Sequence, residues 1–148
     1  MLSMSGKDEF YTMKGYQRNM EEAEMTSAME DYLEMIARLY RHSRCVRVGD
    51  LSRMLHVKPS SVTKMVRQLG RAGYIEAEKY GDISLTDKGR DAGGYLLYRH
   101  DVIRRFLCTL NHTDDELEQA EKIEHFLNRV TVEHLDLLTK RLAKEEGG

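Results

Sequence analysis

Three residues with metal-binding side chains lie close together in the last third of the chain. Glu121, Glu124 and His125 are separated by three and four positions. On an α-helix, residues at i, i+3 and i+4 share one face, so these side chains can converge on a point beside the helix. Glu124 falls at the edge of the apolar stripe, where a carboxylate is costly to bury unless it is paired or metal-bound. The spacing indicates a candidate metal site, with a salt bridge at Glu124 as the simpler alternative.

Two further parts of the sequence carry side chains of the same kind. Asp31 and Glu34 are three positions apart near the start of the chain, and His100 lies between them and the first group in sequence order. Each also has an ordinary interpretation. The acids can form the polar face of a helix, and the histidine can be a partly buried core residue. The residue types alone leave both interpretations open.

A second candidate site lies in the middle of the chain, at residues 59–71. On a helical wheel, apolar residues gather on one side, and hydroxyl and cationic residues gather on the other. The apolar side holds Val62, Met65, Val66 and Leu69, and the polar side holds Ser60, Thr63, Lys64, Arg67 and Arg71. Such a polar face suits the major groove of DNA, because hydroxyls and cations bind phosphates and can reach base edges. An ordinary amphipathic surface helix has the same pattern.

Residues around this helix extend the candidate DNA-binding face. Cationic side chains before the helix and after it could hold the phosphate backbone on either side of the groove. The complete candidate set is Arg47, Lys58, Pro59, Ser60, Ser61, Thr63, Lys64, Arg67 and Lys79.

Three helices are predicted to position the first half of these residues. Residues 27–40 carry apolar side chains at helical spacing, and Ser27-x-x-Glu30 is the pattern of a capping box at the start. A short helix follows at 48–55. Pro59 stands in the first turn of the third helix, where its missing N–H costs no hydrogen bond. The inward-facing residues of the short helix are predicted to be Leu51, Met54 and Leu55.

The period of the sequence changes after the third helix. Residues 74–85 place two apolar stretches around Tyr80-Gly81-Asp82, a turn signal, and this predicts a small β-hairpin. Thr86 then caps a long helix at 87–109. Two adjacent glycines at 93 and 94 lower the helix propensity there and permit a neighbouring helix to approach closely.

Two more helices are predicted after the long one. Thr113-x-x-Glu116 has the pattern of a second capping box and begins a helix that reaches about residue 128. Thr131 begins the last helix, whose apolar side holds Leu135, Leu138 and Leu142. Three helices, a hairpin and three helices form the winged helix-turn-helix order followed by an all-helical half. The predicted fold class is therefore mostly α, with residues 1–26 as an extension that is either a flexible arm or a loosely packed helix.

Composition excludes several other classes of protein. Hydrophobic residues make up 41% and charged residues 32% of the 148 residues, as in ordinary globular proteins. No apolar run approaches the roughly 18 residues of a membrane span, and no signal-peptide core is seen, which predicts a cytoplasmic protein without a membrane partner. Cys45 and Cys108 are far apart, so a thiolate metal cluster or a disulfide framework is not expected.

Charge is spread unevenly along the chain. The formal net charge is only −2, but residues 44–79 carry eight Lys and Arg against three acids. Residues 111–148 carry ten acids against five bases. This asymmetry favours a basic binding face in the middle and an acidic, cation-holding region at the end, although two solvated surfaces of opposite sign would give the same pattern.

Four stretches of the sequence together resemble the manganese-responsive regulators of the diphtheria-toxin-repressor family. They are residues 29–34, 57–66, 98–100 and 121–125, and the match runs from about residue 27 to 142. The resemblance implies a winged helix-turn-helix DNA-binding domain at 27–90 and a helical metal-binding and dimerisation domain at 91–148. It also implies a two-ion site with ligands at Asp31, Glu34, His100, Glu121, Glu124 and His125. The implied partners are a second copy of the chain and a palindromic operator in double-stranded DNA.

Two of these positions bear on the choice of metal. Iron-type members of the family place Met where Asp31 stands and Cys where Glu121 stands. Carboxylates are harder ligands than thioether and thiolate and suit Mn²⁺, although Fe²⁺, Zn²⁺, Co²⁺ or Cd²⁺ could substitute because Mn²⁺ is the weakest binder of the divalent series. The resemblance thus predicts a repressor of metal-uptake genes that responds to Mn²⁺. A response to Fe²⁺ is the alternative.

Two other functions are compatible with the residues alone. One is a winged-helix regulator that responds to a small organic ligand and has a merely solvated acidic cluster. The other is a di-metal hydrolase, since paired carboxylates and histidines also build catalytic centres. Once the six ligands are assigned, the sequence offers no evident nucleophile or general base, so neither an enzyme nor a small organic substrate is expected.

Overall fold

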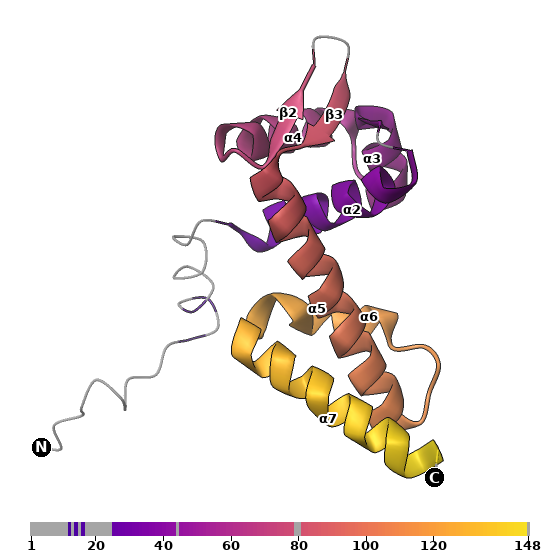
Figure 1. Ribbon diagram of the computed structural model, residues 1–148. Coiled ribbons are helices and arrows are strands. Elements are labelled where there is room, and N and C mark those ends of the chain that lie inside the picture. Colours follow the sequence, from indigo (N-terminus) through magenta and orange to yellow (C-terminus); the bar gives the residue numbers. More distant parts are fainter. Residues whose placement is uncertain are drawn as a thin grey trace, which may run out of the picture.

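The computed structural model describes residues 12, 14, 16, 25–43, 45–78 and 81–147. A long helix joins an N-terminal half, which carries a β-hairpin, to a purely helical C-terminal half (Figure 1). The elements are α2 (Ser27–Ser43), β1 (Val46–Arg47), α3 (Val48–Leu55), α4 (Pro59–Arg71), β2 (Ile75–Ala77), β3 (Asp82–Leu85), α5 (Asp87–Asn111), α6 (Leu117–Ile123), the 3₁₀ helix η1 (Glu124–Phe126) and α7 (Arg129–Gly147). The predicted fold class is confirmed. Residues 1–26, predicted to be a flexible arm or a loosely packed helix, lie almost wholly outside the described residues.

The N-terminal half packs three helices against a small antiparallel sheet. The strand order is β1-β3-β2, and the hairpin register pairs Ile75 with Leu85. The predicted bounds of α3 are confirmed, and α4 begins at Pro59 as predicted. The core side chains come from all of these elements and include Leu33, Ile36, Val46, Leu51, Val62, Leu69 and Ile83.

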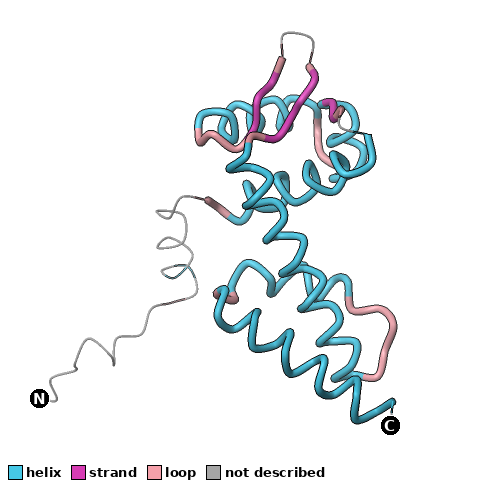
Figure 2. The backbone as a smooth tube through the Cα atoms, viewed as in Figure 1, coloured by secondary structure: helices cyan, strands magenta, loops and turns pink. Residues whose placement is uncertain are grey.

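Helix α5 connects the two halves (Figure 2). Thr86 caps it as predicted, because its side chain accepts a hydrogen bond from the Gly89 N–H at 3.0 Å. A Cβ atom added at Gly93 would lie 2.7 Å from the Cβ of Ala37 in α2. Glycine at this position therefore lets α2 cross α5 in close contact, which brings the polar edge of α2 towards the C-terminal half.

The C-terminal half packs α6, η1 and α7 against the far end of α5. Its core is small and consists of Val102, Ile103, Leu107, Ala120 and Val132, with partly buried apolar residues around them. The predicted helix from the Thr113 capping box to about residue 128 is wrong in its bounds. The Thr113 hydroxyl donates to the Glu116 side chain at 2.9 Å instead of capping, α6 begins only at Leu117, and regular α-helix ends at Ile123.

Three smaller predictions also differ from the structure. The hydroxyl of Thr26, rather than that of Ser27, accepts the first backbone hydrogen bond of α2, from Met29 at 3.1 Å. Met54 is 50% exposed and Leu138 is 39% exposed, so neither faces the core as predicted. Both lie on short or terminal helices whose packed face is set by neighbouring elements rather than by the apolar pattern alone. None of the described helices is long and apolar enough to cross a membrane.

Candidate metal centre and DNA-binding face

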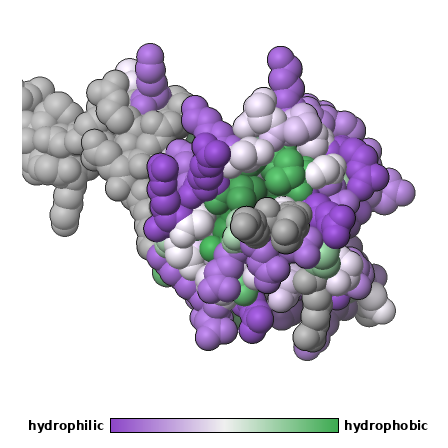
Figure 3. All heavy atoms as spheres, turned by 90° about the horizontal axis from the view of Figure 1, so that it is seen from above, coloured by the Kyte–Doolittle hydropathy of each residue, from purple (hydrophilic) through white to green (hydrophobic). Residues whose placement is uncertain are grey.

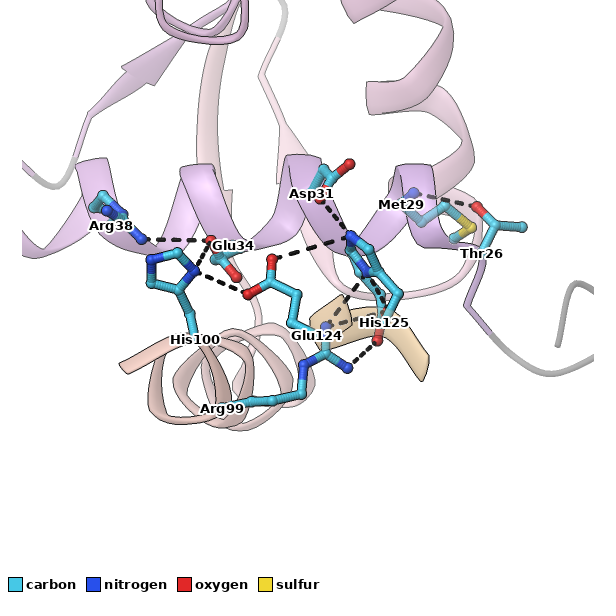
Figure 4. A network of polar contacts seen from close by, with 10 residues as sticks. Thr26, Met29, Asp31, Glu34, Arg38, Arg99, His100, Glu124 and His125 are labelled. Atoms are coloured by element: carbon cyan, nitrogen blue, oxygen red, sulfur yellow. Dashed lines mark hydrogen bonds and ion pairs between the residues drawn. The ribbon is translucent and has the colours of Figure 1, made fainter. Parts of the chain in front are cut away.

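Helix α2 directs three carboxylates towards the C-terminal half. They belong to Glu30, Asp31 and Glu34, whose side chains are 17%, 53% and 13% exposed. Thr26 caps the helix, and the Glu30 side chain extends away from the helix start to Arg99 on α5 and His125 on η1. Figure 4 shows Asp31 and Glu34 on α2 facing His125 and His100.

The first group of possible metal ligands is buried. It consists of Glu34 from α2, His100 from α5 and Glu124 from η1, with donor atoms within 4.8 Å of one another. The His100 Nδ1 lies 2.9 Å from Glu124 Oε2 and 3.8 Å from Glu34 Oε2. The Glu124 side chain is only 1% exposed. Two carboxylates so close together and so poorly hydrated are stabilised by a cation between them.

The pKa values of Glu34 and His100 reflect the closeness of the buried carboxylates in this group. Burial, and after it the negative charge of Glu124, raises the pKa of Glu34 to about 7. The hydrogen bond with Glu124 raises the pKa of His100, against the opposing effect of burial. Protons thus balance the buried negative charge when only protein groups are considered, and a divalent cation could take their place.

The second group is more open. It consists of Asp31, Glu124 and His125. The His125 Nε2 lies 2.9 Å from Asp31 Oδ1 and 4.0 Å from Glu124 Oε1. Burial lowers the pKa of His125, but its hydrogen bonds with Asp31 and Glu30, together with their negative charges, outweigh that effect and raise the pKa to about 9. The exposed side chain of Asp31 leaves room for water or a further ligand.

Glu124 belongs to both groups. Its Oε2 faces His100, and its Oε1 faces His125. A carboxylate that offers one oxygen to each of two neighbouring groups could bridge two divalent ions. Since η1 supplies Glu124 and His125 while α2 supplies Asp31 and Glu34, both groups join the two halves of the molecule.

Glu121 lies in neither group. It is exposed on α6, and α6 ends before Glu124. The predicted convergence of Glu121, Glu124 and His125 assumed one continuous α-helix, and the 3₁₀ helix changes the angular spacing of these residues. The structure thus brings together five of the six predicted ligands, which are Asp31, Glu34, His100, Glu124 and His125.

Sequence reasoning missed two residues beside these groups. Arg99 Nη1 and Nη2 lie 3.1 and 3.3 Å from the two carboxylate oxygens of Glu30, and Glu30 Oε1 also lies 2.9 Å from His125 Nδ1. Burial raises the pKa of Glu30, but the hydrogen bonds from His125 and Arg99 outweigh it, so that the pKa is lowered and Glu30 is a carboxylate. The available signal was an arginine directly before His100 on the apolar side of α5.

The candidate DNA-binding face lies on α4. Val62, Val66 and Leu69 are buried. The opposite side is exposed and consists of Ser60, Ser61, Thr63, Lys64 and Arg67. Lys58 adopts an extended backbone conformation as the N-cap, and Pro59 occupies the first turn, as predicted. The helix therefore presents hydroxyls and cations on an apolar support.

The flanks of this face are built differently. Arg47 is exposed, but its Nε donates to Asp82 Oδ1 at 3.1 Å, which ties β1 to β3. Lys79 lies outside the described residues. Seen from the side of the hairpin, hydrophilic side chains surround a smaller apolar area (Figure 3). The exposed cations of α4 are thus the clearest candidates for phosphate contacts.

Comparisons with known protein families cover both halves. Residues 24–83 match the family described as iron dependent repressor, N-terminal DNA binding domain. Residues 86–148 match the family described as iron dependent repressor, metal binding and dimerisation domain. Together the two matches include α4 and every residue of the two ligand groups.

Individual relatives agree with these matches. The HTH-type transcriptional regulator MntR of Geobacillus kaustophilus (strain HTA426) is 37% identical over 122 residues, which are 82% of this chain and 86% of that protein. The solved structure of the manganese regulator SloR is similar with a TM-score of 0.68 and 31% identity over 78% of this chain. ScaR with bound Zn²⁺ is similar with a TM-score of 0.63 and 28% identity over 76% of this chain. The chain spans about half the length of these two solved chains, 55% and 53%.

Proposed function

The chain belongs to the iron-dependent repressor family. We propose that it is a transcriptional repressor that binds duplex DNA when it holds a divalent cation, and that Mn²⁺ is its physiological cation. One observation carries this proposal: ligand-type side chains from α2 in the DNA-binding half meet side chains from α5 and η1 within 4.8 Å. We assign residues 27–90 to DNA binding and residues 91–148 to metal binding and dimerisation. Repression in the cytoplasm of genes for metal uptake is the corresponding cellular role.

Two ions per subunit fit the arrangement of donors. Glu34, His100 and Glu124 would hold one ion, and Asp31, Glu124 and His125 would hold the other. Glu121 is proposed as a further ligand of the second ion because of its family position, and reaching that ion requires the segment after Ile123 to change its course. Bound there, the ions supply positive charge to carboxylates that both halves contribute.

The donor set favours a hard or borderline metal. It consists of carboxylate oxygens and imidazole nitrogens, with neither of the two cysteines included. Such ligands suit Mn²⁺, whereas Zn²⁺, Cd²⁺, Co²⁺ and Fe²⁺ bind the same donor types at least as strongly. Mn²⁺ is proposed as the physiological ion because the relatives include a manganese regulator, and a Zn²⁺-bound relative supports substitution.

The chain's own residues link this centre to DNA binding. Asp31 and Glu34 lie on α2, which packs against α3, α4 and α5. Fixing these carboxylates relative to η1 restricts the movement of α2, and with it the position of α4, relative to the C-terminal half. Lys64 and Arg67 would then contact phosphates or bases, and Ser60 and Ser61 would donate hydrogen bonds near the groove floor. The Thr63 hydroxyl donates to the Pro59 carbonyl at 3.0 Å, so it would accept a hydrogen bond from a base.

A homodimer through the C-terminal half completes the proposal. That half holds exposed large apolar residues that its own core leaves uncovered, namely Leu110, Leu117, Phe126, Val130, Leu137 and Leu138. Such residues are typical of surfaces that a partner covers. A twofold dimer would present two copies of α4 to successive major grooves, roughly 34 Å apart on a palindromic operator.

The alternatives from sequence are less well supported. The matched relatives are transcriptional regulators, so the chain is not an enzyme, and the hydrolase interpretation is set aside. The family match at 86–148 is to a metal-binding domain, which favours a metal ion over a small organic ligand as the signal.

Operator binding measured with and without Mn²⁺ tests the proposal. The measurement is the fluorescence anisotropy of a labelled duplex that carries a palindromic operator of this repressor family. The protein should bind it about 5–150-fold more tightly with Mn²⁺ than with a chelator, which is the usual change in affinity between coupled binding sites. Glu124→Gln should abolish this response. Glu118→Gln is the matched control, because Glu118 is an exposed acid on the neighbouring α6 that pairs only with Lys122 among the described residues. Equal affinity of the wild type in both conditions would contradict the proposal.

A further inference from the structure

A buried ion pair lies directly behind the more open ligand group. Arg99 is 4% exposed, and its guanidinium contacts both carboxylate oxygens of Glu30. The pair joins α5 to α2, one helical position before His100 and one before Asp31. Neither residue belongs to the two ligand groups. A buried bidentate pair of this kind fixes the position of the carboxylate far better than a solvated one does.

The carboxylate held in this way also contacts the ring of His125. Glu30 Oε1 lies 2.9 Å from Nδ1, whereas the other ring nitrogen, Nε2, lies 2.9 Å from Asp31. A carboxylate only accepts hydrogen bonds, so Nδ1–H donates to Glu30. Arg99 Nη2 lies 3.5 Å from the same Nδ1, but both nitrogens then carry protons, and the shorter contact sets the orientation of the ring. Nε2 is therefore the nitrogen directed towards Asp31 and Glu124.

This arrangement has a known chemical use. A histidine that binds a metal usually donates its other N–H to a carboxylate, which fixes the tautomer and makes the ligating nitrogen more basic. We propose that Glu30, held by Arg99, is the positioning residue of His125 for metal binding through Nε2. This inference rests on the proposed function and assigns to two further residues a part in the metal response.

The proposed effect is confined to one of the two groups. Glu30 contacts His125, which belongs to the group with Asp31, and it has no described contact with His100, Glu34 or Glu124. His100 is oriented by the other group itself, since its Nδ1 faces Glu124. Loss of Glu30 should therefore weaken one ion and leave the other bound.

Four variants separate positioning from folding. Glu30→Gln keeps the size and an acceptor but removes the charge, and Glu30→Leu removes both. The double variant Glu30→Leu/Arg99→Met removes the two buried charges together, so that no unpaired guanidinium is left in the core. Asp136→Asn is the matched control, because Asp136 is another buried carboxylate paired with an arginine, Arg105 at 3.2 Å, and it lies outside both ligand groups.

Calorimetric titration with Cd²⁺ alone, in the absence of DNA, is the first measurement. Wild type and Asp136→Asn should bind two ions per subunit. Glu30→Leu and the double variant should keep one ion and bind the other about 10–100-fold more weakly. This is the usual loss of metal affinity when the hydrogen-bond partner of a metal-binding histidine is removed. Glu30→Gln should lie between them. Circular dichroism identifies any variant that is unfolded. If Glu30→Leu is unfolded, the metal affinities of the double variant test the inference in its place.

The nitrogen signals of His125 supply a second measurement that a merely structural role would not change. In Cd²⁺-loaded wild type, ¹⁵N NMR should show a protonated Nδ1 and a metal-bound Nε2, and Glu30→Leu should lose the protected Nδ1–H. Unchanged affinities and unchanged His125 signals in both Glu30→Leu and the double variant would overturn the inference while leaving the proposed metal centre in place. A wild type that binds no ion would overturn both.

Discussion

The polar side of α4 and the polar groups between α2 and η1 are built in opposite ways. On α4, Lys64 and Arg67 stand exposed on an apolar support. Between α2 and η1, Glu124 is buried and lies in contact distance of two histidines. Exposed groups on one helix act nearly independently, whereas groups that share a buried carboxylate act as a unit. The two regions should therefore respond differently to substitution.

The largest effect should come from pairs of changes within the buried group. Glu34→Gln and His100→Gln each replace one of the three ligand side chains of the group formed by Glu34, His100 and Glu124. Each single variant should lose more than about 100-fold in affinity for the ion at this group, and the double variant should lose little more than either single one, because residues in one site are not additive. Calorimetry with Mn²⁺ measures the affinities. If the two losses in binding free energy simply add, the buried group does not act as a unit and does not differ from α4 in this respect.

The corresponding changes on α4 should be additive and smaller. Lys64→Ala and Arg67→Ala should each weaken operator binding and reduce the slope of log K against log salt by about 0.9, the value for one lost phosphate contact on duplex DNA. The double variant should show the sum. Metal affinity in the absence of DNA should not change, since both side chains lie outside the ligand groups. A fall in metal affinity would mean that α4 is not the DNA-contacting element.

The pH dependence of folding should distinguish the two ligand groups from each other. Burial and the charge of Glu124 raise the pKa of Glu34 from 4.5 to about 7, so the folded protein binds more protons than the unfolded chain between these values. The stability that the neutral carboxyl contributes is present below about pH 4.5 and is lost as the pH rises through about 7. Urea unfolding with a chelator present should show this loss in wild type and not in Glu34→Gln.

His125 gives the matching experiment for the open group. Its pKa is raised from 6.5 to about 9, so the stability due to its charged ring is complete below about pH 6.5 and is lost as the pH rises through 9. His125→Gln should remove this upper part of the pH dependence and leave the lower part, the reverse of Glu34→Gln. If both variants flatten the same pH range, the two groups are not electrostatically distinct.

The success of sequence prediction follows the same division between regions. The start of α4 and the cap of α5 were predicted correctly because Pro59 and Thr86 act on their own backbone. The meeting of α2 with α5 and η1 was implied by a family resemblance, since the spacing of carboxylates within one segment cannot show which distant segment faces them. The 3₁₀ helix at Glu124 was missed because the sequence around it has ordinary helix propensity. Ser27-x-x-Glu30 predicts a capping box because the pattern does not reveal that Thr26, rather than Ser27, caps α2.

Glu121 offers the smallest and most discriminating test, because it is exposed like the side chains of α4 and yet is proposed as a ligand. Glu121→Gln should lower Mn²⁺ affinity only at the group of Asp31 and His125, and by less than the loss of Glu34 or His100 costs, since Glu121 lies outside that group in the described arrangement. Glu121→Cys should shift preference towards Zn²⁺, because a thiolate is a softer ligand than a carboxylate. Competition titrations between Mn²⁺ and Zn²⁺ measure both effects, with Glu118→Gln as the exposed control on the same helix. Unchanged competition in both Glu121 variants would show that α6 contributes no ligand and that the centre consists of the five residues that the fold already brings together.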